Sequence, residues 1–142
     1  MIKKESSTPN GKLSPADIQP STNLPDVDLS GIDLVSTDFT DINFYGADLS
    51  DTSLVDANLS ATDLSNASFD GADLSDVDLS GAELSGVNLT SADLTEADLT
   101  DANLREAELT AADLTHITLT RANLSYAKLD RANLRYASHG LR

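Results

Sequence analysis

The sequence predicts an all-β fold, a solenoid wound from one short repeating unit. Two observations support this prediction. From Leu24 to Leu134 every fifth residue is Leu or Phe, 23 in succession. Two positions before each of them the residue is small or β-branched, such as Val27, Ile32 or Ala47. A period of five fits neither an α-helix nor an ordinary strand, so the whole stretch is interpreted as one repeated structural unit.

Each unit has a consistent internal pattern around its Leu or Phe, which we name the central residue. The residue before it is mostly Asp or Asn, the residue after it is mostly Ser or Thr, and the next one is variable and polar. Residues two apart in an extended segment point to the same side. The central residue and the small residue two positions earlier are therefore expected to face inward, where burying each Leu contributes roughly 1.5–3 kcal/mol.

The units resemble the A(D/N)LXX repeats of the pentapeptide-repeat family, as in ADLSD at 47–51, ANLSA at 57–61 and ADLTE at 92–96. The resemblance extends from Thr22 to Tyr136. It implies a right-handed, four-sided parallel β-helix with one pentapeptide on each side, and chain chirality also favours right-handed crossovers. Four sides of five residues make a 20-residue coil. The repeats then give about six coils and a rod about 27 Å long, at roughly 4.8 Å per strand layer.

The two ends of the chain depart from the repeat. The N-terminal segment is mostly polar and contains three prolines, so it forms either a disordered tail or a short capping helix. In the second case Ser14 is the N-cap, Pro15 takes the first helical position, and Leu13 and Ile18 cover the first coil. The predicted parts are this N-terminal segment (1–21), the β-helix (22–136) and a C-terminal tail (137–142).

The composition argues against several function classes. The chain has 24 acidic and 9 basic residues, for a net charge of −15, which disfavours direct binding to nucleic acid or anionic lipid. Without cysteine there is no disulfide, thiolate metal site or Cys nucleophile. The two histidines, His116 and His139, have neither a nucleophile to activate nor a metal-ligand spacing around them. We therefore expect a non-enzymatic protein without a catalytic, cofactor or metal site.

Neither a secretion signal nor a membrane-spanning run is evident in the sequence. The basic N-terminus lacks the apolar segment of a signal peptide, and no apolar run approaches spanning length. A cytoplasmic location is the expectation.

The acidic residues are concentrated in the body of the rod. Between Leu13 and Leu104 there are 19 acidic residues and no Lys or Arg, which is about one charge per Å of rod, against about one per 1.7 Å in duplex DNA. Coils of 20 residues stack residues 20 apart, so two adjoining sides become densely anionic. The candidate acidic face consists of Asp33, Asp38, Asp56, Asp73, Asp76, Asp78, Asp93, Glu96, Asp98, Asp101 and Asp113.

Three functional hypotheses follow from this surface. In the first, the rod is a structural or protein-binding module for a basic partner, and its acidity also suits a high-salt cytoplasm. In the second, the family resemblance extends to members that mimic DNA and bind DNA gyrase or another type II topoisomerase, as quinolone-resistance and toxin self-protection factors do. The third is a cation-binding ladder of Asp residues or a minor enzymatic role.

The C-terminal end is a candidate surface for self-association. A β-helix that stops at Leu134 leaves unpaired strand edges and an open apolar interior. Six of the nine basic residues lie from position 105 onward, and two of the three tyrosines lie there too. The family resembled often dimerises through this end. The sequence therefore predicts an end-to-end homodimer with candidate contacts at Tyr126, Leu134, Tyr136 and Leu141.

Overall fold

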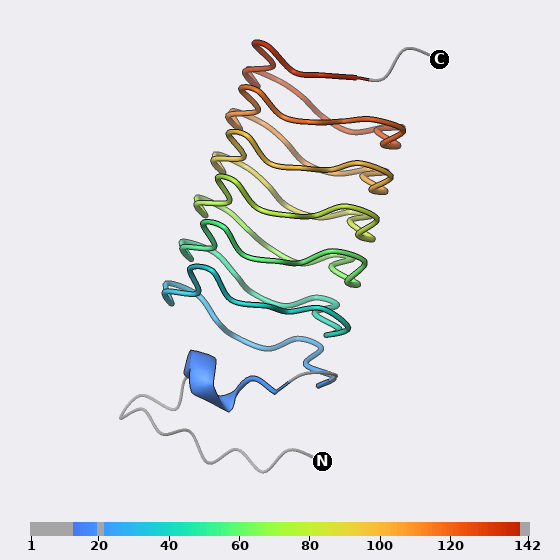
Figure 1. Ribbon diagram of the computed structural model, residues 1–142. Helices are drawn as coiled ribbons and strands as arrows, with labels where there is room; N and C mark the ends of the chain where they lie inside the picture. The colour runs from blue at the N-terminus through green and yellow to red at the C-terminus, as the bar shows by residue number, and fades with distance from the viewer. Residues whose placement is uncertain (1–12, 20–21, 140–142) are drawn as a thin grey trace.

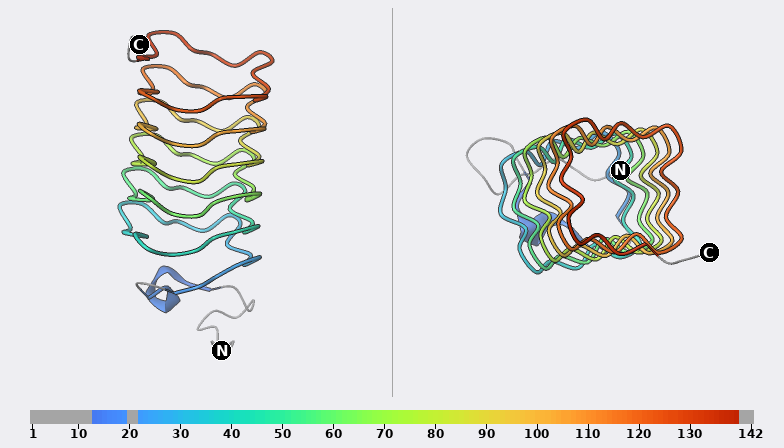
Figure 2. Two further views of the ribbon diagram at one scale, coloured as in Figure 1. Left: turned by 90° about the vertical axis from the view of Figure 1, so that its right-hand side faces the viewer. Right: turned by 90° about the horizontal axis from the view of Figure 1, so that it is seen from above.

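The computed structural model describes residues 13–19 and 22–139, which form one rod of stacked coils (Figure 1). Viewed along its axis the rod has a four-sided outline (Figure 2, right). Parallel bridges join residues 20 apart, from Asn23 with Asn43 to Thr118 with Ser138. Each coil therefore takes 20 residues, one pentapeptide to a side. The predicted four-sided parallel β-helix is confirmed.

The four sides are named here by their first central residue. Side A begins with Leu24, side B with Leu29, side C with Leu34 and side D with Phe39, and residues 20, 40 and more positions later continue each side. Sides A and C are opposite, as are B and D. Each side is paired through a single bridge residue per coil, the one before the central residue, so the solenoid is built from isolated bridges.

Two inward side chains from every side fill the interior. The central residues are buried from Leu24 to Leu114, and the residues two positions earlier are buried from Ile42 to Ile117. Only two of these inward residues are polar. Thr52 and Thr62 donate their hydroxyls to the carbonyls of the preceding central residues, each at 2.6 Å, and thereby satisfy the polar group that is buried.

The prediction that all 23 central residues are buried is wrong at the C-terminal end. Leu119, Leu124 and Leu129 are only half-buried, and Leu134 is 40% exposed. The cause is geometric, because a central side chain is enclosed by the coils below and above it. Within the described part of the chain, no coil lies above the last one.

Corners are made by the residue two positions after each central residue. These residues adopt left-handed backbone, as in Gly31 at φ 69° and, without glycine, Asp56 at φ 57°. Left-handed backbone costs an ordinary residue roughly 1–2 kcal/mol, and hydrogen bonds between coils offset that strain. The N–H groups of Leu74 and Asp76 donate to carbonyls of the coil above at 2.7 and 2.9 Å, and that of Asp93 donates to the coil below at 3.0 Å.

The first coil is covered by a short 3₁₀ helix, η1 (Pro15–Asp17), at the lower end of the rod in Figure 1. Ser14 is its N-cap, and both the backbone N–H and the hydroxyl of Ser14 donate to Asp17 Oδ2 at 2.7 Å. Leu13 and Ile18 flank the helix and pack against the core cluster. Within the described ranges there is no helix of the length and apolarity that crossing a membrane requires.

Candidate acidic interface

The structure places ten of the eleven predicted acidic residues on sides C and D and on the corner between them. One bridge column on side C and one on side D supply seven of these residues, and the corner supplies three. The eleventh, Asp101, lies at the far corner of side D. The side C column contains Asp33, Asp73, Asp93 and Asp113, the side D column Asp38, Asp78 and Asp98, and the corner Asp56, Asp76 and Glu96.

Side B also carries carboxylates, which the sequence-based prediction left out. Its bridge column begins with Asp28 and Asp48 but continues with Ser68 and Asn88. Near its C-terminal end side B also has Lys128 and Arg131. Side C is therefore the most anionic side, because it alone stacks acidic residues in three successive coils of one bridge column, at Asp73, Asp93 and Asp113.

The bridge-column carboxylates also have a local structural role. Asp93 Oδ1 accepts the backbone N–H of Thr95 at 2.9 Å and its hydroxyl at 2.6 Å. Asn58 on side D accepts the same two bonds from Ser60, at 3.0 and 2.7 Å. This Asx-type turn needs a side-chain oxygen and not a charge. It explains why Asp or Asn precedes most central residues and Ser or Thr follows most of them.

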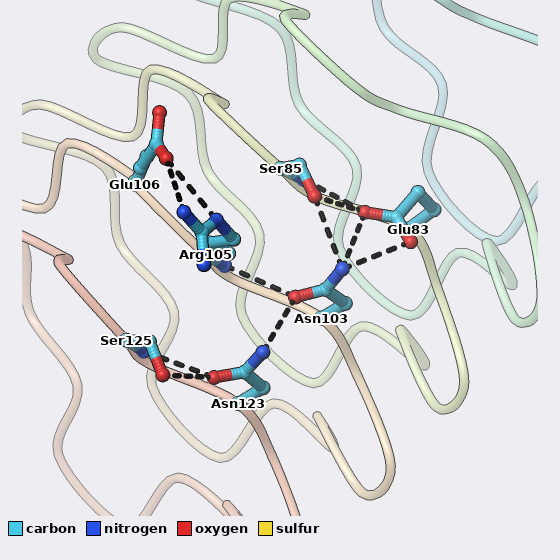
Figure 3. A network of polar contacts seen from close by, with 7 residues as sticks. All are labelled: Glu83, Ser85, Asn103, Arg105, Glu106, Asn123 and Ser125. Atoms are coloured by element: carbon cyan, nitrogen blue, oxygen red, sulfur yellow. Dashed lines mark hydrogen bonds and ion pairs between the residues drawn. The ribbon is translucent and has the colours of Figure 1, made fainter.

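Three Asn residues in the bridge columns, Asn103, Asn123 and Asn133, make a further bond between coils. On side A, Asn103 Nδ2 donates to both carboxylate oxygens of Glu83, at 2.8 and 3.0 Å, and Asn123 Nδ2 donates to Asn103 Oδ1 at 3.2 Å (Figure 3). On side C, Asn133 Nδ2 donates to Asp113 Oδ1 at 3.2 Å. An ionised Asp has no donor, so an Asp above another Asp forms no such bond and adds like-charge repulsion.

The stacked carboxylates of side C are therefore not required by the fold. At Asp73, Asp93 and Asp113 an Asn would make the same turn and could bond to its neighbouring coil. The adjacent corner residues Asp56, Asp76 and Glu96 are exposed, and none of them forms an ion pair within the described part of the chain. Together these six residues form two neighbouring rows of carboxylates, one along the bridge column and one along the corner.

Hydrogen bonds keep several carboxylates ionised into the acid range. The Thr40 hydroxyl and N–H lower the pKa of Asp38, and the Thr115 hydroxyl lowers that of Asp113. Arg121, at 2.5–2.6 Å, lowers the pKa of Asp101. The last of these bonds connects the terminal coil to the coil below.

Lys128 makes a second connection of this kind on side B. Its ammonium group lies 2.9 Å from Glu108 and lowers the pKa of that carboxyl, an effect to which the Thr110 hydroxyl adds. Both connections join residues 20 apart, so they hold the terminal coil on the rod.

We expect the terminal coil to loosen in acid. A carboxyl with a lowered folded-state pKa contributes stability that is complete above its unfolded pKa, about 3.9 for Asp and 4.3 for Glu, and that is lost as pH falls through the lower folded value. Thermal melting from pH 6 to pH 2 tests this. The double variant Asp101→Asn, Glu108→Gln should melt slightly below wild type at pH 6 and converge with it in acid. If the difference in melting temperature between the double variant and wild type does not change with pH, the two carboxylates do not hold the terminal coil through their charge.

The predicted self-association residues surround the open end of the helix. Tyr126 and Tyr136 are 75% and 70% exposed, and Leu134 is 40% exposed, whereas Leu141 lies outside the described residues. An apolar hollow of about 440 Å³ opens there. It is lined by Leu119, Arg121, Ala122, Leu124, Leu134, Ala137 and His139.

Two contacts beside this hollow were missed from the sequence. The Arg105 guanidinium lies 4.9 Å from the Tyr126 ring centroid, and His116 stacks on Tyr136 with centroids 4.8 Å apart. The signal that could have found them is the 20-residue coil, since the members of each pair are 20 or 21 positions apart. Within the described ranges no group of three His, Cys, Asp or Glu residues is arranged to hold a metal ion.

Comparison with known proteins identifies the family. The family model for pentapeptide repeats, which contains eight copies, matches residues 21–51, 42–81, 52–90, 82–121 and 97–135. No curated protein matches the chain.

Several solved structures are similar. The pentapeptide repeat protein Rfr23 from the cyanobacterium Cyanothece 51142 is 27% identical over 83% of this chain and 87% of its own, with a TM-score of 0.62. HetL, involved in heterocyst differentiation regulation in the cyanobacterium Nostoc, is 28% identical over 82% of this chain and 68% of its own, with a TM-score of 0.36. The plasmid-mediated fluoroquinolone resistance protein QnrB1 is 20% identical over 81% of this chain and 71% of its own, with a TM-score of 0.33. With the family model matched from residue 21 to residue 135, the chain belongs to the pentapeptide-repeat family and is a right-handed quadrilateral β-helix.

Proposed function

We propose that this protein is a non-enzymatic binding module that presents the acidic surface of sides C and D to a partner protein with a basic surface. The observation that carries the proposal is the stack of Asp73, Asp93 and Asp113 in three successive coils. Neighbouring coils are about 4.8 Å apart, so these like charges repel one another. The fold accepts Asn at equivalent positions, which favours a role for the charges in recognition.

The corner residues strengthen this proposal. Asp56, Asp76 and Glu96 lie one above another beside the bridge column, and they are exposed. A basic partner running along the rod would meet two parallel rows of carboxylates. Complementary charge of this kind mainly raises association rate and specificity, and it weakens as salt is added. Proteins whose basic surfaces normally bind nucleic acid fit this chemistry, and a cytoplasmic location is part of the proposal.

Two triple variants with equal change of charge test the proposal. Asp56→Asn, Asp76→Asn, Glu96→Gln neutralises the corner between sides C and D. Asp26→Asn, Asp51→Asn, Glu106→Gln neutralises three corner residues elsewhere on the rod. Some proteins from host lysate should be retained equally by wild type and by the second variant. The same proteins should bind the first variant, with its neutral C/D corner, at least about tenfold more weakly than they bind wild type.

The same experiment separates recognition from general acidity. If both triple variants retain the same proteins equally well, the acidic surface is not a specific site, and adaptation to a salty cytoplasm explains the composition. Repetition at two salt concentrations adds a second criterion, because specific capture should decrease as ionic strength rises.

A second candidate partner is a type II topoisomerase, favoured by the linear charge density of the rod. A DNA-mimicking rod should compete with DNA for purified gyrase, and the corner variant should compete less well than its matched control. Unchanged DNA binding and supercoiling at rod concentrations well above those of the enzyme would exclude this candidate.

We also propose that two rods associate through their C-terminal coils. The exposed Leu134, the half-buried Leu124 and the open hollow support this proposal, because a second copy would cover apolar surface that the chain itself leaves open. Tyr126 and Tyr136 would lie at the edge of the contact.

A further inference from the structure

The last coil ends in an unpaired backbone edge. One coil lower, the N–H groups of Leu104 and Glu106 donate to the coil above at 2.8 and 2.9 Å. Their counterparts, Leu124 and Tyr126, have no acceptor within the described part of the chain, and the same holds on sides B and C. The edge surrounds the apolar hollow, and an unpaired edge is a template for a second chain.

Arg and Tyr alternate at the corners of this coil. In chain order the corners are Arg121, Tyr126, Arg131 and Tyr136, with φ between 56° and 62°. The two tyrosines therefore lie at diagonally opposite corners. Arg121 is engaged with Asp101 in the coil below. Arg131 has no ion pair or ring contact among the described residues, and it lies between the tyrosines.

Symmetry limits how two such ends can meet. When two copies are related by a two-fold axis perpendicular to the rods, each corner of one end faces one corner of the other end. The direction of the axis decides which corners face each other. If the axis follows a diagonal, Arg131 faces either itself or Arg121 of the other copy, and each Tyr corner likewise faces a Tyr corner, so no Arg lies over a ring. If the axis bisects two opposite sides, every Arg corner faces a Tyr corner. Arg over an aromatic ring is an attractive contact, so the second kind of axis is favoured.

Two axes remain, each bisecting a pair of opposite sides, and the exposed faces of the two tyrosine rings favour one of them. Tyr136 has His116 stacked on one face, and Arg135 lies 6.0 Å from its centroid. Among the described residues only Arg105 lies against the Tyr126 ring, and Tyr126 is 75% exposed, so the other face of its ring is accessible. We infer that in a dimer Arg131 of one copy packs over Tyr126 of the other, twice, about an axis bisecting sides B and D. This inference rests on the proposed C-terminal dimer.

Single-cysteine cross-linking tests the inference, because the chain has no cysteine of its own. Variants Tyr126→Cys and Arg131→Cys are mixed at high protein concentration and treated with a short bis-maleimide. A cross-linked pair is expected from the mixture but not from either variant alone. Ala61→Cys, at a corner in the body of the rod, is the matched control. It should not be cross-linked to either of the other two variants.

Other cross-linking patterns overturn the inference while leaving the dimer. Cross-linking of Arg131→Cys with itself indicates a diagonal axis, and cross-linking with Tyr136→Cys indicates the axis through sides A and C. If light scattering shows that the wild-type protein is monomeric at high concentration, both the proposed dimer and this inference are wrong.

Dimer affinity gives an independent measurement. Arg131→Ala and Tyr126→Ala should each weaken the dimer by about tenfold, because each removes the same two cation–π contacts. The double variant should be little weaker than either single variant, since residues in direct contact are not additive. Fully additive effects would show that the two side chains do not touch.

Discussion

Replacing Leu79 with Asp should unfold the rod. Leu79 is a central residue of side D in the middle of the solenoid, and its side chain is completely buried. A carboxylate there would have no partner in an apolar interior, and such substitutions are among the most destabilising single changes. We expect a loss of about 4 kcal/mol or more, a large part of the roughly 5–15 kcal/mol available to a typical domain. Thermal melting followed by circular dichroism measures the effect.

Leu134→Asp provides the matched control. The residue has the same type and repeat position, but its side chain is 40% exposed. An Asp there remains in contact with water, so the melting temperature of the monomer should change little. A Leu79→Asp variant that melts within a degree or two of wild type would show that the inward positions have been wrongly assigned.

Replacing Asp73, Asp93 and Asp113 together with Asn should make the protein more stable. The substitution removes two like-charge contacts, and the amides can bond between coils as Asn123 and Asn103 do on side A. Each such change is worth roughly 0.2–1 kcal/mol, so a total gain of about 1–3 kcal/mol is expected. The difference in melting temperature should be largest at low salt, because salt screens the repulsion in wild type.

Asp33→Asn is the control for this stabilisation. Asp33 belongs to the same column, but its neighbour in the coil above is Ser53, so no stacked carboxylates are separated and little gain is expected. The triple variant should at the same time lose affinity for a basic partner. A triple variant that melts at or below the wild-type temperature at low salt would remove the main support for the proposed function.

The inward positions could be predicted from the sequence because the repeat is strictly local. An extended segment places residues two apart on one side, so the period alone identifies Leu29 or Leu104 as buried, and both are. The same pattern fails at Leu134, whose local sequence resembles that of any other unit. What differs there is that no further coil lies above Leu134 among the described residues, and the position of a unit within the solenoid cannot be read from its local sequence.

The candidate site could be predicted in part for a similar reason. Once the coil has 20 residues, the column of Asp73, Asp93 and Asp113 follows from residue numbers alone. The hydrogen bonds that distinguish Asn from Asp in a column depend on side-chain geometry, and the sequence did not reveal them. The stacking of His116 on Tyr136 likewise depends on side-chain rotamers at two corners.

The 3₁₀ helix at the N-terminal end has a consequence for assembly. A solenoid repeats its own geometry, so the coil ending near Leu134 could be continued by the first coil of another copy, beginning at Leu24. Stacking of this kind does not close and would extend into a fibre. With Leu13 and Ile18 lying across the first coil, that surface is already occupied. The η1 segment would therefore hinder head-to-tail stacking of copies at this end of the rod.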